Sequence, residues 1–521
     1  TYSYVVDNII TYKNRFGLHD VEATLVATRD EMKYTRNQIT GSDFASAGST
    51  TLGSSGLHYA TVQKFNLNGA YRKANIGYLA RANYGFNSRY YLTASVRRDG
   101  ASVFGSNTKW GTFASVGVAW RISEERFLKN FKPLDNLKLK FSWGQNGNQA
   151  IDPYATLSKV QNGPAGGIRY EFSDTGDKIY YGLVQSNMGN YNLGWESTDA
   201  LNTGFESIWL NNRLFVDIDI YHSKTYDQLF SRVIPSMTGF SSITTSMGQV
   251  NNTGVELTVN SVNVQSKDWR WSTSVTYWKN KNKLVKLYGE DIDGDGKEDD
   301  DIGNSLFIGK SLGAIYGFKQ IGIVQEDDAE YMELTGALPG NPKYADLDGK
   351  PGITNDDRTI LGYSKENFRL NMSNTVRYKN FELYIMLVGT FGGNNHYMKE
   401  NPRAFQINGS GMFMDNTIPI PYWTPENKSN TYPSATFTGD NRFKGLQSRT
   451  FVRVQDVSLS YTFDRSLLKS VNINNLKVYL TAKNPLIFTK WEGVDAETGR
   501  RYNDGNLPVL STYSLGVNIS F

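Results

Sequence analysis

Apolar and polar residues alternate with a period of two along most of the chain, and stretches with helical periodicity are scarce. In the last segment, apolar residues occupy every second position from Tyr513 to Phe521, and Ser, Gly and Asn fill the positions between them. The same alternation recurs at 214–221, 457–464 and 476–483. The pattern predicts an all-β chain whose strands each present one apolar face and one polar face.

Segment length separates a membrane barrel from a soluble sandwich. Strands of soluble sheets are commonly about five to six residues long, whereas these segments often exceed ten and carry aromatic residues near their ends. Membrane strands need about 9 to 11 residues and place aromatic side chains at both interfaces. A transmembrane antiparallel β-barrel is therefore predicted, with the following residues in its aromatic girdles: Tyr90, Tyr91, Trp110, Trp120, Trp143, Trp209, Trp271 and Trp278.

About fifteen strands are predicted. They start near Ser3, Val21, Ala74, Arg89, Gly111, Leu137, Trp195, Leu214, Gly248, Trp269, Phe368, Phe381, Phe451, Leu476 and Tyr513. Because bacterial single-chain barrels have an even number of strands, either one strand is miscounted or the chain is a barrel fragment that begins near an external loop.

Short and long connections alternate along the chain. The short ones include 87–88, 211–212 and 379–380; the long ones lie near 40–61, 148–190, 287–367, 392–446 and 491–510. Outer-membrane barrels have short periplasmic turns and long external loops. This asymmetry places the long connections outside the cell and Phe521 at the periplasmic rim.

Composition excludes several classes of protein. Among 521 residues, 55 Lys and Arg against 51 Asp and Glu give a net charge of +4 without a basic block, so nucleic acid is not an expected partner. The absence of cysteine excludes disulfides and thiolate metal sites. No apolar run approaches the roughly 18 residues of a membrane-spanning helix. The first residues, Thr1 to Val6, read as the middle of a strand, as expected for a processed exported protein or a fragment.

The segment from Asp291 to Asp301 is the sharpest local motif. Asp291, Asp293 and Asp295 stand at positions one, three and five, and Gly296 follows at six, as in the opening of a calcium loop. Ile302 occupies position twelve, where such loops usually carry a bidentate Glu. Asp299, Asp300 or Asp301 could close the site in its place, and Asp299 is taken as the fourth expected ligand. A solvated acidic loop is the alternative.

No catalytic constellation is predicted, so the protein is not expected to be an enzyme. None of the four histidines stands at a triad or metal-ligand spacing, and no nucleophile elbow or phosphate loop occurs in a usable context. Aromatic residues in the long loops are candidates for stacking on sugar rings or peptides, although packing within the loops is favoured for any single one. They are Tyr154, Tyr170, Tyr180, Tyr181, Phe405, Phe413, Tyr422, Trp423 and Tyr432.

An ordered set of motifs resembles the SusC/RagA family of TonB-dependent outer-membrane proteins. The motifs lie at 90–105, 110–111, 117–125, 137–149, 195–198, 248–256, 316–323 and 483–486, and the resemblance spans roughly residues 65 to 521. It implies a 22-stranded barrel filled by an N-terminal plug. The whole chain, 1–521, then corresponds to the C-terminal part of that barrel, and the plug and seven strands are absent from it.

A second acidic loop, from Asp346 to Arg358, is similar to a calcium-loop-like segment of that family. The family often has Asp where Lys350 stands and Gly where Pro351 stands. A cation at the fifth ligand position repels a metal, so an ordered loop with Arg358 in a structural ion pair is favoured here.

The resemblance implies active import of an oligosaccharide or oligopeptide across the outer membrane of a Gram-negative bacterium. The implied partners are a SusD-like surface lipoprotein, the missing N-terminal plug and barrel segment, the TonB-ExbB-ExbD complex, and the surrounding lipid and lipopolysaccharide. Calcium is the only cofactor suggested. A passive porin or structural barrel is the first alternative, and a soluble glycan-binding β protein is the second.

Overall fold

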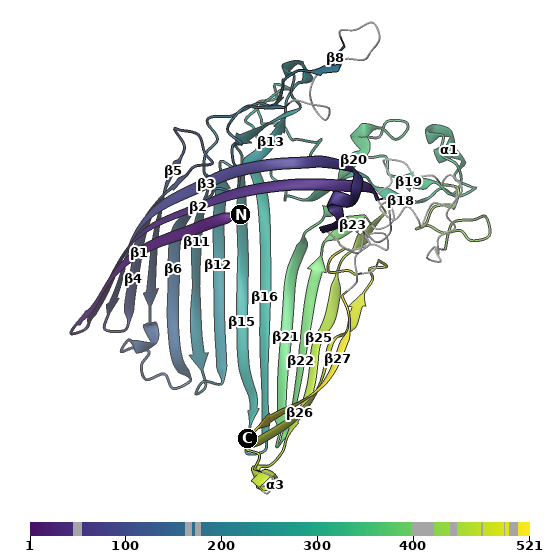
Figure 1. Ribbon diagram of the computed structural model, residues 1–521. Coiled ribbons are helices and arrows are strands. Elements are labelled where there is room, and N and C mark those ends of the chain that lie inside the picture. The colour runs from purple at the N-terminus through teal and green to yellow at the C-terminus, as the bar shows by residue number, and fades with distance from the viewer. Residues whose placement is uncertain are drawn as a thin grey trace. The chain divides into compact units, whose positions relative to one another are not determined.

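A computed structural model describes residues 1–44, 55–161, 169–171, 179–396, 421–437, 445–469, 472–493, 495–499 and 509–521. Fifteen strands are hydrogen-bonded in one sheet, in chain order (Figure 1). They are β1 Tyr2–Phe16, β2 His19–Phe44, β3 Ala60–Phe86, β4 Tyr90–Ala101, β5 Trp110–Trp120, β6 Leu134–Asn148, β11 Glu196–Trp209, β12 Leu214–Tyr226, β15 Gln249–Gln265, β16 Trp269–Lys286, β21 Glu366–Tyr378, β22 Phe381–Gly392, β25 Phe451–Thr462, β26 Asn475–Thr489 and β27 Thr512–Ser520.

The predicted number of strands is confirmed, and fourteen of the fifteen predicted starts lie within three residues of the observed ones. The exception is β3, which starts at Ala60 rather than near Ala74, while β2 continues to Phe44 into the predicted 40–61 loop. The ladder between β2 and β3 runs on to the pair Phe44 and Ala60, with a bulge at Gln38. Few apolar residues line this extension, so hydrogen bonding continues where the alternation that marks a strand in sequence has stopped.

The tight turns have the backbone that short hairpins require. Asn87 and Ser88 have φ of 52° and 53°, and the Arg89 N–H donates to the Phe86 carbonyl at 3.0 Å. Positive φ at both central residues is typical of a type I′ turn, whose twist matches the flanking strands. The other connection is one residue longer: Leu210, Asn211 and Asn212 have φ of 59°, 57° and 62°, and the Arg213 N–H donates to the Trp209 carbonyl at 3.0 Å. Asn tolerates this conformation better than most residues, which explains its use at these connections.

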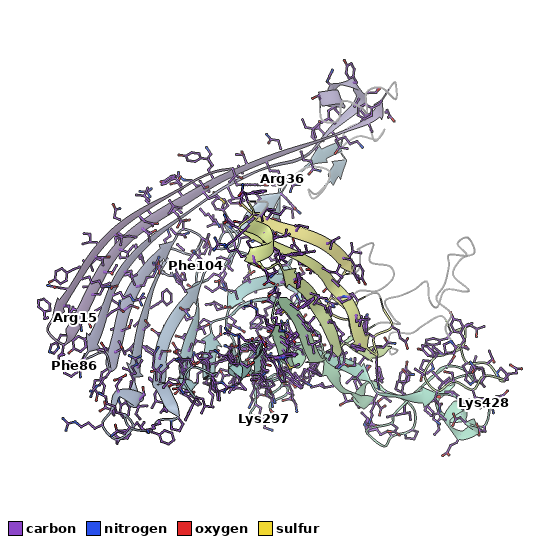
Figure 2. All side chains as sticks on the ribbon, turned by 90° about the horizontal axis from the view of Figure 1, so that it is seen from below. Arg15, Arg36, Phe86, Phe104, Lys297 and Lys428 are labelled. Carbon is purple, nitrogen blue, oxygen red and sulfur yellow. The ribbon has the colours of Figure 1, made fainter. Side chains whose placement is uncertain are left out.

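The chain divides into two compact units, each described by itself. The first comprises residues 1–121, 140–202 and 223–250. In Figure 2, Arg15 and Phe86 lie at the end of its strands that carries the tight turns, and Arg36 lies toward the opposite end. On β4, the exposed Leu92 and Val96 share one face, while Ser95 on the other face bonds the Ser115 hydroxyl at 2.7 Å.

The second unit comprises residues 122–139, 203–222 and 251–521. Its strands β21, β22, β25, β26 and β27 lie side by side (Figure 1). At the end with the tight turns, the rings of Trp269 and Tyr378 lie 4.5 Å apart, and those of Phe381 and Tyr461 lie 4.7 Å apart. These aromatic pairs are arranged as expected for an interfacial girdle.

Short elements occupy the connections between the wall strands. The paired strands are β7 Lys159–Gln161 with β10 Val184–Asn187, β8 Arg169–Glu171 with β9 Ile179–Tyr181, β13 Leu229–Val233 with β14 Ser242–Ser246, β17 Ala314–Phe318 with β20 Arg358–Tyr363, β18 Gln320–Ile323 with β19 Pro342–Tyr344, and β23 Asn394–His396 with β24 Leu446–Ser448. The pair β13 and β14 lies where no long loop was predicted. Helices in the described residues include α1 Ala329–Thr335 and α3 Arg465–Leu468, and 3-10 turns lie at Ile122–Glu124, Ser236–Thr238 and Asn355–Asp357. In the described residues, no helix is both long enough and apolar enough to cross a membrane.

Candidate functional site in the external loops

The loop between β16 and β21 folds into a lobe of its own within the second unit. Two short sheets, β17 with β20 and β18 with β19, form its frame, and α1 lies between β18 and β19 in the chain. Asp328 precedes α1, and its carboxylate accepts bonds from the Gln325 N–H at 2.8 Å and from the Lys343 ammonium. These two donors hold the pKa of Asp328 below its ordinary value.

Residues 421–437 pack on this lobe. The Trp423 indole is 7% exposed, and its N–H donates to the Gln325 side-chain carbonyl at 2.9 Å. The Ser434 N–H donates to the Gly340 carbonyl at 2.8 Å. Gly340 has φ of +87°, and a Cβ there would lie 2.6 Å from both Ser434 and Trp423. Glycine is therefore required for this close approach.

A recess of about 430 Å³ opens beside these elements. Phe318, Ile321 and Leu361 supply apolar walls, while Gln320 and Asn430 supply amide groups. Ile321 is 54% exposed, which leaves a large apolar side chain free to contact a ligand. A mixture of apolar walls and few polar groups is typical of ligand-binding recesses.

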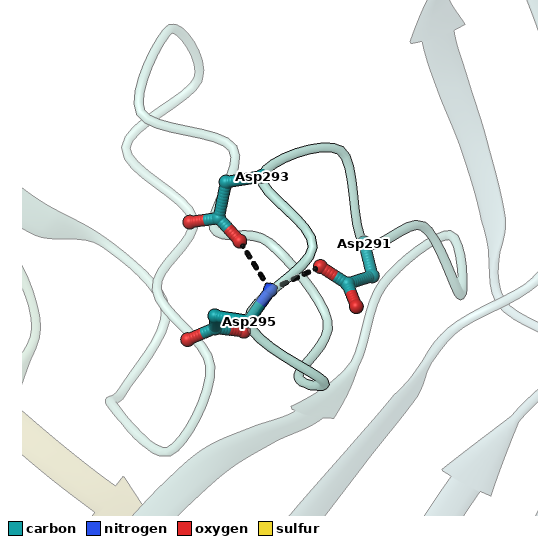
Figure 3. Close-up of side chains that lie close together, drawn as sticks. All are labelled: Asp291, Asp293 and Asp295. Atoms are coloured by element: carbon teal, nitrogen blue, oxygen red, sulfur yellow. Dashed lines mark hydrogen bonds between the residues drawn. The ribbon is translucent and has the colours of Figure 1, made fainter.

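The first acidic loop gathers three of its four predicted metal ligands. Asp291, Asp293 and Asp295 bring carboxylate oxygens within 4.8 Å of one another (Figure 3). Asp291 accepts the N–H groups of Gly294 at 2.8 Å and Gly296 at 2.9 Å, and Asp295 N–H donates to both Asp291 and Asp293 at 3.1 Å. The loop thus wraps its backbone around the first carboxylate, as a glycine-bearing calcium loop does.

The fourth predicted ligand, Asp299, is not part of that group of three. Its carboxylate accepts the Ile292 N–H at 2.6 Å. The neighbouring Glu298 is likewise engaged by backbone, accepting the N–H groups of Leu287 at 2.7 Å and Gly289 at 2.6 Å. Both acidic side chains therefore fix the base of the loop.

The second acidic loop is organised around a buried carboxylate. Asp357 is fully buried and accepts the N–H groups of Leu347 at 2.6 Å and Thr354 at 2.7 Å. These backbone donors hold the pKa of Asp357 below its ordinary value. Thr354 and Asp357 form a capping box around the 3-10 turn between them.

A cation of the chain itself lies in the second loop. The Lys350 ammonium is 3.1 Å from an Asp348 oxygen and 3.4 Å from an Asp356 oxygen. Asp348 and Asp356 raise the pKa of Lys350. Asp346, Asp348 and Asp357 form a second group of carboxylates, whose oxygens lie within 4.8 Å of one another. Lys350 neutralises part of the negative charge of this group, in the place of a metal ion.

Arg358 forms no ion pair with any residue that the structure describes, so the prediction of a structural ion pair is wrong. The Arg358 guanidinium donates to the Asn355 carbonyl at 3.0 Å and lies 5.3 Å from the centre of the Tyr316 ring. Arg358 leads directly into β20, which pairs with β17, and this pairing brings the guanidinium over an aromatic face instead of a carboxylate.

Several of the candidate aromatic residues pack within the loops. Tyr432 contacts the buried cluster of Phe451, Trp491 and Ala496, and its hydroxyl donates to Glu492 at 2.8 Å. Trp423 packs as described above, and burial raises the pKa of Tyr422. Tyr154 and Tyr180 are exposed. Phe405 and Phe413 lie outside the described residues, as do the side chains of Tyr170 and Tyr181.

The sequence interpretation missed a buried ion pair at the start of β25. Arg453 donates to Asp495 at 3.0 Å, with side chains 9% and 3% exposed, and also to Glu497. Asp495 additionally accepts the Glu497 N–H at 3.0 Å and the Thr498 hydroxyl at 3.3 Å. The pair fixes residues 495–499 to the wall strand.

Comparison with known proteins places this arrangement in a family. The family model described as "TonB dependent receptor-like, beta-barrel" matches residues 2–484. The chain belongs to this family. TonB-dependent receptor P3 of Formosa agariphila is 29% identical over 99% of this chain and 52% of its own length. TonB-dependent receptor SusC of Bacteroides thetaiotaomicron is 29% identical over 87% of this chain and 44% of its own length.

This TonB-dependent receptor chain is also similar to a solved structure, "Structure of the RagAB peptide transporter". The match covers 100% of this chain and 55% of the chain in that structure, with a TM-score of 0.81 and 25% sequence identity. The predicted fold class, family and outer-membrane localisation are thereby confirmed. The chain spans about half the length of the relatives it matches. These relatives are receptors or transporters.

Proposed function

We propose that the protein containing this chain imports an oligosaccharide or oligopeptide across the outer membrane, powered by the TonB-ExbB-ExbD complex and assisted by a SusD-like surface lipoprotein. The observation that carries the proposal is the match over the whole chain to RagAB, a peptide transporter, together with the match to SusC. The external lobe, with its recess beside Ile321 and Asn430, supplies a surface on which such a ligand would be held.

Uptake by cells producing the complete protein tests this function. The complete protein is purified with the proteins that accompany it, and bound oligosaccharides and peptides are identified by mass spectrometry. The identified compound is then labelled and its uptake measured in cells with and without TonB. Import predicts uptake that is lost without TonB, whereas uptake that persists unchanged would favour a passive porin.

We also propose that the loop from Asp291 to Asp299 binds calcium through Asp291, Asp293 and Asp295. Three exposed carboxylates within 4.8 Å of one another repel. Lys297, 3.8 Å from an Asp295 oxygen and largely exposed, offsets only part of this charge. Metal that binds only the ordered loop stabilises that state by mass action. Calcium is expected to slow proteolysis of this loop, and Asp291→Asn is expected to abolish the effect.

The second acidic loop serves as the matched control, since Lys350 already supplies a positive charge there. Its proteolysis should not change with calcium. Equal protection of both loops, or of neither, would contradict the assignment of calcium to the first loop.

A further inference from the structure

A cluster of cations lies on the apolar face of the first unit, at the end of the strands opposite the tight turns. The register places Arg29 of β2 beside Ile76 of β3, and Arg98 of β4 beside Tyr78 of β3. Lys33 and Arg72 are cross-strand neighbours further along β2 and β3. Since side chains alternate between faces with a period of two, these four cations share one face with the exposed Leu25 and Val96.

This face is the lipid-facing side of the wall. Leu25 and Val96 are 57% and 46% exposed, while the opposite face carries polar contacts such as Thr93 with Asn83 at 2.9 Å. Membrane barrels turn their apolar face to lipid and bound it with aromatic residues. Tyr78 and Trp110, 54% and 47% exposed, stack with ring centres 6.5 Å apart at the upper limit of this apolar band.

The cations outnumber the carboxylates on this face. Glu31 accepts Arg72 at 2.7 Å and lies 3.7 Å from Arg29, so one carboxylate is shared between two guanidinium groups. Arg98 lies 5.5 Å from the centre of the Trp110 ring and, among the described residues, forms no ion pair. Arg29, Arg72 and Arg98 are all exposed. The excess positive charge is thus directed outward at the depth where the apolar band ends.

We propose that Arg29, Arg72 and Arg98 bind the phosphate groups of an anionic lipid of the outer leaflet. Arg guanidinium groups bond phosphate oxygens in a bidentate manner. Strands are about 4.8 Å apart and rise about 3.4 Å per residue. Arg29 and Arg98 are two strands apart and offset by two residues along the strands, so their backbones are separated by roughly 12 Å, a distance that a lipid carrying two phosphates spans. Trp110 is level with Arg29 and Tyr78 is level with Arg98, so the aromatic pair lies among the cations and contacts the first carbons of the acyl chains. This assignment depends on the outer-membrane location and not on the imported substrate.

Lipid binding by the complete protein tests the proposal. The protein is purified in detergent, and retention of bisphosphorylated lipid A, of dephosphorylated lipid A and of inorganic phosphate is measured by native mass spectrometry and phosphorus analysis. The double variant Arg29→Gln with Arg98→Gln is compared with the wild type. The single variant Arg98→Gln is compared as well, and its matched control is Arg81→Gln, which also removes one positive charge but from the polar face of β3, where Arg81 contacts Asn83.

The double variant is expected to bind bisphosphorylated lipid A at least about tenfold more weakly, since each cation near an anionic lipid surface contributes roughly a factor of five. Arg81→Gln should bind as the wild type does. Removing the phosphates from lipid A should weaken its binding to the wild type and to Arg81→Gln but not to the double variant. Equal binding by the double variant, equal weakening by Arg81→Gln, or competition by inorganic phosphate at similar concentrations would overturn the proposal.

Assembly is checked separately by the heat-dependent mobility of the barrel on gels. If the double variant fails to assemble, Arg98→Gln alone decides the question, because Arg98 forms no ion pair among the described residues and its guanidinium lies over the Trp110 ring. TonB-dependent uptake is expected to be unchanged in Arg98→Gln, so failure of this proposal is distinguishable from failure of the import function.

Discussion

Replacing Arg453 with Met should release residues 495–499 from the wall. Arg453 and Asp495 are 9% and 3% exposed and 3.0 Å apart. Removing one member of a buried pair costs about 3 to 5 kcal/mol, because the other charge is left buried without its partner. The lower end applies here, since Asp495 keeps the Glu497 N–H and the Thr498 hydroxyl as donors.

Hydrogen exchange measures this local opening directly. A loss of about 3 kcal/mol raises the exchange rate of amides between Asp495 and Gly499 by roughly 150-fold when opening is a rapid pre-equilibrium. Arg377→Met is the matched control, because Arg377 pairs with Glu382 but is 58% exposed. Exposed pairs contribute less than about 1 kcal/mol, so amides near the control site should change by less than about fivefold. An equally small change at Asp495 would refute the reasoning from burial.

Two further predictions concern the wall and the second acidic loop. Val96→Arg should destabilise the barrel by about 2 to 4 kcal/mol in lipid, and Ser95→Asn on the polar face by less than about 1 kcal/mol; unfolding titrations in bilayers measure both, and the reverse order would invalidate the facing assignment. The pKa of Asp357 is lowered from 3.8, so its contribution to loop stability is complete above pH 3.8 and is lost as the pH falls through the lowered pKa; pepsin cleavage of the loop should accelerate over that range in the wild type but not in Asp357→Asn.

The wall was predictable from sequence because one physical rule governs it. A strand between lipid and a polar interior must alternate, so every start except that of β3 could be located from the period. The tight turns were equally visible, since Asn at 87, 211 and 212 supplies the positive φ of short hairpins. The extension of β2 and β3 was missed because, beyond the apolar band, neither face needs a continuous run of apolar residues.

The loops were predictable only where the contacts are local. Asp291 bonds backbone groups three to five residues away, and the spacing of its motif gave the arrangement of three of the four expected ligands. Asp299 lies outside that group of three and accepts the Ile292 N–H, a backbone donor that carries no sequence signal. Arg453 and Asp495 are 42 positions apart in the sequence. No periodic pattern of residues connects the two positions, so their pairing could not be predicted.

This difference between wall and loops bears on how such proteins acquire new ligands. The wall is fixed by a repeated pattern in which each strand depends on its two neighbours, whereas the lobe is fixed by single contacts such as Trp423 with Gln325. A change in the recess beside Ile321 therefore alters few of the bonds that hold the wall together. The lobe can therefore change without altering the strands, as expected of loops carried on a rigid scaffold.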